Sequence, residues 1–310
     1  MTQTFLLADM GGTNIRFAIF DGQQISHYQS YKCQNFGTIF DVLSEYKKQI
    51  ERWPESFVLA VPGIVKEGRL SFVNNKWIFS KEELKSFGFK NVILLNDFQA
   101  VAFGVPCLVE DDILLIKDGK KYADKPSVVM GAGTGLGVGV LLPQVDGSYI
   151  TLPSEAGHIS VSITNETEEK IHAFICQKSS RVSAGHLLSS AGIRNIYTVL
   201  SKKELSSEEI VTLALQGDET ARQTIIQMFN FWGDIAGDLA LAFVAMGGVY
   251  LTGNIIQTNG MFELLKESDF CARFVSKGRH SEFLNSIPIF MNKRSDLAFC
   301  GLKKTIENFL

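Results

Sequence analysis

The spacing of apolar residues changes several times along the first hundred residues and predicts both strands and helices. Apolar residues 40, 43, 46 and 50 recur at helical spacing, so we expect a helix over 39–52. Ser80 stands three residues before Glu83, which is the spacing of a capping box at a helix start. Strands are expected at 4–8, 15–20, 26–32, 57–61 and 92–95. This pattern is typical of an α/β domain with a largely internal sheet.

The second half begins with strand-like segments and becomes mostly helical. Gly247 and Gly248 are expected to end its longest helix, because glycine commonly follows the last helical residue. Strands are predicted at 113–116, 127–130, 138–142, 149–152, 249–252 and 287–291. Helices are predicted at 166–177, 182–200, 207–215, 219–245 and 296–309. Each half thus contains a strand, a glycine turn and a second strand followed by helices, as an internal duplication would produce.

Two glycine-rich turns interrupt the apolar segments. The first reads Asp9-Met10-Gly11-Gly12-Thr13-Asn14, and the second runs from Gly131 to Gly137 as GAGTGLG. Strand-like residues flank both, so each predicts a hairpin with a small tip rich in exposed backbone N–H groups. Glycine lets the backbone approach a phosphate closely, and the Thr13 and Thr134 hydroxyls add donors. A plain hairpin turn is the alternative for either one, but it does not explain why the chain has two.

Common nucleotide-binding motifs do not account for these turns. No Gly-Lys pair meets the spacing of a P-loop. Counting from Gly131 places Leu136 where a dinucleotide fingerprint needs its third glycine, and the same mismatch excludes the glycine loop of protein kinases. A hairpin that binds phosphate, used twice, is the remaining hypothesis.

Composition and charge narrow the classes of partner. With 310 residues, 45% of them hydrophobic, the chain can bury a large core, and its length suggests two domains. A net charge of −3 provides no basic surface for nucleic acid or an anionic membrane. We find no run of eighteen apolar residues and no leader segment, so a cytoplasmic protein is expected. The five cysteines are odd in number and scattered, which argues for reduced thiols rather than disulfides or a zinc site.

Four motifs together resemble the bacterial glucokinase family, part of the hexokinase, actin and Hsp70 superfamily. They are Asp9-x-Gly-Gly-Thr-Asn-x-Arg16, Leu95-Asn-Asp-Phe98, Gly131–Gly137, and Leu152-Pro-x-Glu-x-Gly-His158. The related repressor and sugar-kinase group has a cysteine cluster after this last motif, and none follows His158 here. The resemblance implies a two-lobed, actin-like ATPase (ribonuclease H-like) α/β fold of mixed sheets flanked by helices, with a mostly helical larger second lobe. The expected domains are 1–106 plus 295–310, and 107–294.

The resemblance also implies an enzyme that phosphorylates glucose at its 6-hydroxyl with ATP and Mg²⁺. Asp97 is the implied general base, although it can equally cap a helix that begins at Phe98. Asp9 is the implied magnesium residue, acting through water, and its alternative role is to stabilise the turn. The implied sugar ligands are Asn74, Asn96, Asp97, Glu155 and His158. The implied nucleotide contacts are Ala8, Asp9, Met10, Gly11, Gly12, Thr13, Gly131, Gly133, Thr134, Gly135 and Gly253.

Other residues near these motifs receive more ordinary interpretations. His158 by itself would usually be a histidine satisfied within the core, but its place three residues after Glu155 favours a sugar ligand. Arg16 is interpreted as a structural ion-pair residue and Trp77 as part of the core. Family resemblance further suggests a homodimer, and the net charge favours no nucleic acid or membrane partner.

One departure from the family pattern bears on the substrate. Relatives usually carry a second sugar-binding glutamate in the segment Val182-Ser-Ala-Gly-His186, and Gly185 stands there instead. Losing such a carboxylate weakens binding if its partner is left unpaired. Two alternatives therefore stay open, a sensor of sugar or nucleotide built on a kinase fold and a kinase of another hexose. An ATPase-type interaction module is a third, but it gives no reason for the sugar-facing residues.

Overall fold

The computed structural model describes residues 3–63, 65–66, 69–70 and 77–309. Its strands are β1 (Phe5–Met10), β2 (Asn14–Phe20), β3 (Ile25–Lys32), β4 (Ser56–Val61), β5 (Val65–Lys66), β6 (Arg69–Leu70), β7 (Phe79–Ser80), β8 (Asn91–Asn96), β9 (Ile113–Lys117), β10 (Ser127–Ala132), β11 (Leu136–Pro143), β12 (Tyr149–Leu152), β13 (Val249–Thr252) and β14 (Ile289–Asn292). Its α-helices are α1 (Ile39–Lys47), α2 (Lys81–Ser86), α3 (Asp97–Gly104), α4 (Glu166–Cys176), α5 (Ser190–Ser201), α6 (Ser207–Leu215), α7 (Glu219–Phe243), α8 (Asn254–Gln257), α9 (Met261–Glu267), α10 (Phe270–Val275), α11 (Ser281–Asn285) and α12 (Leu297–Phe309).

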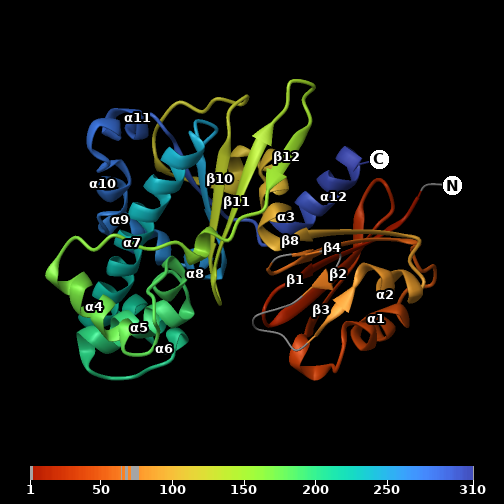
Figure 1. Cartoon of the computed structure of the whole chain (residues 1–310), viewed down its shortest axis with the longest axis horizontal. Coiled ribbons are helices and arrows are strands. Elements are labelled where there is room, and N and C mark those ends of the chain that lie inside the picture. Colours follow the sequence, from red (N-terminus) through yellow and green to blue (C-terminus); the bar gives the residue numbers. More distant parts are fainter. Residues whose placement is uncertain (1–2, 64, 67–68, 71–76, 310) are drawn as a thin grey trace. The chain divides into compact units, whose positions relative to one another are not determined.

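The chain divides into two compact units, coloured by sequence in Figure 1. Unit 1 contains Met1–Leu108, Ser148–Pro153 and Ser295–Leu310, and unit 2 contains Val109–Gly147 and Ser154–Arg294. Two mixed sheets of five and six strands form among the described residues, with a small three-stranded sheet of β5, β6 and β7. In the part of the chain that is described, no helix is long and apolar enough to span a membrane.

The sheet of unit 1 has the order β3-β2-β1-β4-β8. β1 pairs antiparallel with β2 and parallel with β4, and β4 pairs parallel with β8. Every residue of β1 and β4 is buried, because helices cover both faces of these central strands. α1 packs into the same core cluster as Leu6 and Ala8, while α12 contacts β1 and β4. Aromatic rings fill much of this core, with Phe17 stacked on Tyr46 at 5.0 Å between ring centroids.

Helices α3 and α12 touch along their backbones. A Cβ atom on Gly301 of α12 would collide with the carbonyl oxygen of Ala100 in α3, and a Cβ on Gly104 would collide with that of Leu297. Only glycine permits this approach. The two helices lie side by side in Figure 1. The contact with α12 holds α3 in place, and α3 follows directly on β8.

Unit 2 contains the strands β11-β10-β13-β14-β9 in that order. β10 pairs antiparallel with β11 and parallel with β13, and β13 pairs parallel with β14. Helix α7, 25 residues long, lies in the core and packs against α5, α6 and α10. Gly233 and Gly237 let α10 approach it closely, since a Cβ at either would collide with a carbonyl oxygen of α10.

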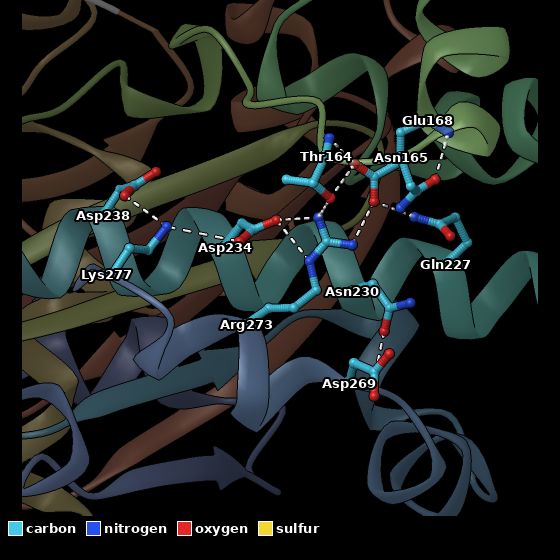
Figure 2. A network of polar contacts seen from close by, with 10 residues as sticks. All are labelled: Thr164, Asn165, Glu168, Gln227, Asn230, Asp234, Asp238, Asp269, Arg273 and Lys277. Atoms are coloured by element: carbon cyan, nitrogen blue, oxygen red, sulfur yellow. Dashed lines mark hydrogen bonds and ion pairs between the residues drawn. The ribbon is translucent and has the colours of Figure 1, made fainter. Parts of the chain in front are cut away.

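A buried network of charged and polar groups joins α4, α7 and α10 (Figure 2). Glu168, with no exposed surface, accepts hydrogen bonds from Thr164 N at 2.8 Å and Gln227 Nε2 at 3.0 Å, and it pairs with Arg273. Arg273 also pairs with Asp234, its Nε lying 2.7 Å from Oδ2. Burial raises the pKa of Glu168, but the hydrogen bonds from Arg273 and Thr164 outweigh it and leave the pKa lowered.

Most of the predicted elements are confirmed. The strands appear within two residues of their expected bounds, the Ser80–Glu83 capping box forms, and Trp77 is buried at 3% exposure. The helix predicted over 182–200 is wrong for residues 182–189. It begins at Ser190, because the Ser189 hydroxyl accepts from Gly192 N at 3.1 Å as an N-cap and bonds back to Gly185 O.

Some helix ends also differ from the prediction, and some short helices were not predicted. The first helix ends at Lys47 instead of residue 52, and α7 ends at Phe243, ahead of the two glycines expected to end it. The pattern between 254 and 285 predicted no helix, yet α8 to α11 form there. Each has seven residues or fewer, too few turns to show a periodic apolar stripe.

Candidate active site

The first glycine turn connects β1 to β2 and places Asp9 beside Arg16. Gly11 N donates to Asn14 O at 2.8 Å, which closes the turn, and Thr13 is exposed at its tip. Asp9 and Arg16 are register partners across the hairpin. Arg16 donates through Nε at 3.0 Å, and through Nη2, to Asp9 Oδ2. Arg16 is therefore an ion-pair residue, as the sequence predicted.

The junction of β8 and α3 presents Asn96 and Asp97. The alternative in which Asp97 caps a helix starting at Phe98 is wrong, since α3 begins at Asp97 and Asn96 caps it. Asn96 Oδ1 accepts from Phe98 N at 2.9 Å, and its Nδ2 donates to Gly63 O at 3.2 Å. Asp97 is half-buried in the first helical turn, where the peptide dipoles stabilise a carboxylate.

Strand register brings these acidic residues to one edge of the sheet of unit 1. Asp9 of β1 pairs with Ala60 of β4, and Ala60 pairs with Leu95 of β8, one residue before Asn96. Parallel strands about 4.8 Å apart then separate the Asp9 backbone from the end of β8 by about 10 Å. Two carboxylates thus lie at the carboxyl edge of one sheet, where open α/β sheets usually bind ligands.

One residue at this edge, Gln99, was not predicted from the sequence. The Gln99 Nε2 donates to Thr151 O at 3.2 Å, and its Oε1 accepts from Asn96 N at 3.1 Å. It completes a capping box with Asn96 and so holds the residue next to Asp97. The signal was present as Asn-x-x-Gln, the spacing used to predict the helix at Ser80.

The second glycine turn, in unit 2, connects β10 to β11. Gly133 N donates to Gly135 O at 2.9 Å, and Ser190 N donates to Gly133 O at 2.8 Å, while Thr134 and Gly135 are exposed. The end of β13 lies beside this turn, with Gly131 opposite Thr252. The backbone next to it has a φ of +99° at Gly253, and a Cβ there would collide with Ala132 O.

A short 3₁₀ turn in unit 2, Ala156–His158, presents Glu155 and His158 together. His158 Nε2 lies 3.7 Å from Glu155 Oε2, and the two side chains are 72% and 42% exposed. Gly157 is fixed in place, because a Cβ there would collide with Leu136 O of β11. An exposed carboxylate and imidazole on a rigid turn can accept and donate hydrogen bonds to a ligand.

Gly185 lies directly against that turn. A Cβ added to Gly185 would be 3.2 Å from Gly157 O, and Ala184 N donates to Ile159 O at 2.9 Å. The neighbouring His186 is turned toward the backbone of Ser183, whose N–H donates to His186 Nδ1 at 3.1 Å. Position 185 is therefore adjacent to Glu155 and His158 within unit 2, although neither the sequence nor the fold provides it with a carboxylate.

The predicted site residues divide between the two units. Unit 1 holds Ala8, Asp9, Met10, Gly11, Gly12, Thr13, Asn96 and Asp97. Unit 2 holds Gly131, Gly133, Thr134, Gly135, Glu155, His158 and Gly253. Asn74 lies outside the described residues.

The two mixed sheets, their flanking helices and their glycine hairpins define a kinase fold of the actin-like ATPase class. Residues 6–309 match the family model described as Glucokinase. The glucokinase of Helicobacter acinonychis is 34% identical over 332 residues, covering 100% of this chain and 98% of that protein. The chain belongs to the glucokinase family. It is accordingly an enzyme of the sugar-kinase class, and the resemblance and fold class inferred from the sequence are confirmed.

Solved structures of related proteins agree with this assignment. A glucokinase from an Antarctic psychrotroph has a TM-score of 0.84 and 30% identity, covering 99% of this chain and 100% of that one. A glucokinase of the ROK family from Streptomyces griseus, in complex with glucose and AMPPNP, has a TM-score of 0.65 and 17% identity, covering 98% of each chain. At that identity the second comparison supports the fold alone.

Proposed function

We propose that this enzyme transfers the terminal phosphoryl group of ATP to the 6-hydroxyl of glucose, with Asp97 as the general base. The observation that carries the proposal is the placement of Asp97 at the start of α3, at the edge of the sheet where the strand of Asp9 also ends. Membership of the glucokinase family supports the choice of glucose and ATP as substrates.

A sugar hydroxyl is a weak nucleophile, so a base must accept its proton as the new P–O bond forms. Asp97 is suited to that role because its position in the first turn of α3 favours the ionised carboxylate. The Asn96 cap, bonded to Phe98 N and Gly63 O, keeps the helix start rigid. A base placed in this way contributes about 10²–10⁴-fold to the rate.

Sugar recognition requires rigid groups that both donate and accept hydrogen bonds. We assign Asn96, Asp97, Glu155 and His158 to the hydroxyl groups of the hexose, and Asn74 stays a further candidate. Glu155 and His158 lie within 3.7 Å of each other on a turn fixed by Gly157, so their bonds to a sugar require little reordering.

The two glycine turns are assigned to the phosphates of ATP. Their exposed tips offer backbone N–H groups and the hydroxyls of Thr13 and Thr134, which fit an anionic ligand. Gly253 is assigned to the nucleoside, because only a residue without Cβ fits beside Ala132. Bound Mg²⁺ would neutralise phosphate charge, and the buried Asp9 carboxylate is the group placed to orient its water ligands.

A second function, phosphorylation of another hexose or ligand sensing without turnover, is favoured by one observation. Gly185 brings no carboxylate to the turn of Glu155 and His158, although its backbone lies against Gly157 O. A hexose hydroxyl that faced this position would be left without a partner, which costs about 1–3 kcal/mol of binding.

An ADP-release assay against a panel of hexoses, with a control lacking sugar, tests these functions together. We expect release that depends on glucose, and a decrease of about 10²–10⁴-fold in the Asp97→Asn variant with glucose binding retained. Turnover only with another hexose would favour the alternative substrate, and a ligand-induced thermal shift without product would indicate a sensor. Release independent of sugar, or near-normal turnover in Asp97→Asn, would refute the proposal.

We further propose that the enzyme acts in the cytoplasm, where ATP is available, and as a homodimer, as the family resemblance suggests. Light scattering during gel filtration measures the assembly directly. A single species near 34.3 kDa, the mass of one chain, would exclude the dimer.

A further inference from the structure

Arg16 has more partners than an ion pair within a hairpin requires. Besides Asp9, its Nη1 donates to Ser295 O at 2.9 Å, a contact that spans 279 residues of sequence. Its guanidinium lies 5.6 Å from the centre of the Phe299 ring, which itself packs edge-on against Tyr28 at 5.1 Å. Arg16 therefore joins the first hairpin to the C-terminal helix within unit 1.

The contact with Asp9 fixes one orientation of that carboxylate. Both donors of Arg16 converge on Oδ2, and Oδ1 has no hydrogen-bond partner among the described residues. Asp9 is 9% exposed, so few other rotamers are open to it. A carboxylate already neutralised in part by a guanidinium binds a metal ion directly less well, yet it still accepts strongly from metal-bound water.

The same arginine leads to the second carboxylate through α12. Ser295 lies two residues before α12 and Phe299 lies in its first turn, and α12 contacts α3 backbone to backbone at Gly301 and Ala100. α3 begins with Asp97. A continuous set of rigid contacts thus runs from Asp9 through Arg16 and α12 to the helix that carries the base.

We propose that Arg16 is a positioning residue for phosphoryl transfer, which holds Asp9 as an acceptor for the water ligands of Mg²⁺ and ties it to the C-terminal helix. This inference rests on the proposed function, because Asp9 accepts from the water ligands of Mg²⁺ only if the enzyme uses Mg-ATP. In this role Arg16 acts through Asp9 and not directly on the reacting atoms or the phosphates.

Binding of AMPPNP, measured by calorimetry with and without Mg²⁺, tests the inference without relying on turnover. We expect Arg16→Gln to weaken binding with Mg²⁺ by about threefold to tenfold, the effect of freeing one ordered side chain, and to leave binding without Mg²⁺ unchanged. Arg16→Lys keeps the charge without the planar fork, so it should restore binding in part. In kinetics, the KM for Mg-ATP should rise while the KM for the sugar stays constant.

A double-mutant cycle separates positioning from a general loss of structure. If Arg16 acts through Asp9, then Arg16→Gln should add little to the loss of Mg²⁺-dependent binding in Asp9→Asn. Arg222→Gln, which removes an ion pair with Glu267 in unit 2, is the matched control and should leave AMPPNP binding unchanged. Should Arg16→Gln fail to fold, the cycle is run with Arg16→Lys.

Two results would overturn the inference. One is AMPPNP binding that depends on Mg²⁺ as strongly in the Arg16 variants as in the wild type. The other is a loss of Mg²⁺-dependent binding free energy in the double variant that equals the sum of the losses from Arg16→Gln and Asp9→Asn. Failure of the proposed function has a different signature, which is wild-type protein that binds AMPPNP with Mg²⁺ but releases no ADP with any sugar. If Mg²⁺ has no effect on wild-type binding, the inference is also refuted.

Discussion

At the residue scale, single positions carry most of what is specific to this chain. The motifs predicted Asp9, Asn96 and Asp97 as site residues, and the alternative role considered for Asp97, that of helix cap, belongs to Asn96. Capping depends on which residue keeps extended backbone, and Asn96 does so with a ψ of 147°. A one-residue shift of this kind is below the resolution of sequence patterns, yet it decides that the Asn96 amide caps the helix and that Asp97 stands in its first turn.

Val244 offers a stability test at this scale. It ends α7 in the left-handed region, with a φ of +49°, which is costly for a β-branched residue, and it is 50% exposed. Val244→Gly should stabilise the protein by about 1 kcal/mol, which raises the melting temperature by roughly 2 °C. Calorimetry measures the change. Val145→Gly, at an exposed turn position without positive φ, should give no gain, and an equal gain there would refute the strain argument.

At the scale of elements, close helix contacts within each unit and a buried charge network within unit 2 hold helices together. α3 and α12 meet through Gly104 and Gly301, and α7 and α10 meet through Gly233 and Gly237. The sequence predicted that these helices exist, apart from α10, but not that the glycines are contact points. A glycine within a helix shows its purpose only when the neighbouring backbone is known.

Gly301→Ala tests the contact behind the catalytic helix. The new Cβ would collide with Ala100 O, a backbone atom that cannot move without shifting α3. We expect a loss of about 3 kcal/mol in the free energy of unfolding, measured by urea denaturation. Gly135→Ala, whose Cβ would enter open space, should leave unfolding unchanged. A stable Gly301→Ala variant would show that the two helices can separate freely.

The network of α4, α7 and α10 predicts a dependence of stability on pH. The pKa of Glu168 is lowered from 4.5 in the folded protein, so its ion pair with Arg273 stabilises the fold above that pH and is lost as the pH falls through the folded pKa. Glu168→Gln should cost about 3 kcal/mol at pH 7, and the difference from wild type should shrink toward pH 3. Urea unfolding at both pH values measures it.

The control for this prediction lies on the same helix. Glu166 forms an exposed pair with Lys170, and its replacement by glutamine should change stability little at either pH. A Glu168→Gln difference that persisted unchanged at pH 3 would mean that packing, and not the charge, accounts for the loss.

At the scale of the whole molecule, both units repeat one strand topology. In each, an antiparallel hairpin is followed by two parallel strands, as β2-β1-β4-β8 and as β11-β10-β13-β14. Each hairpin carries one of the glycine turns. This order supports the duplication suspected from the sequence, and each unit has its own hydrophobic core. The domain bounds of 1–106 with 295–310, and 107–294, stay a prediction.

The sequence by itself determined the features whose cause is local. Short apolar runs defined the strands, glycine and threonine marked the turns, and Ser80 marked a helix start, because each depends on neighbours within a few residues. Only the tertiary structure decided the partners of Arg16, the burial of Glu168 and the contact at Gly301. These depend on residues tens to hundreds of positions away, which are brought together when the sheet orders its strands and the helices pack on it, and no local pattern records that distance.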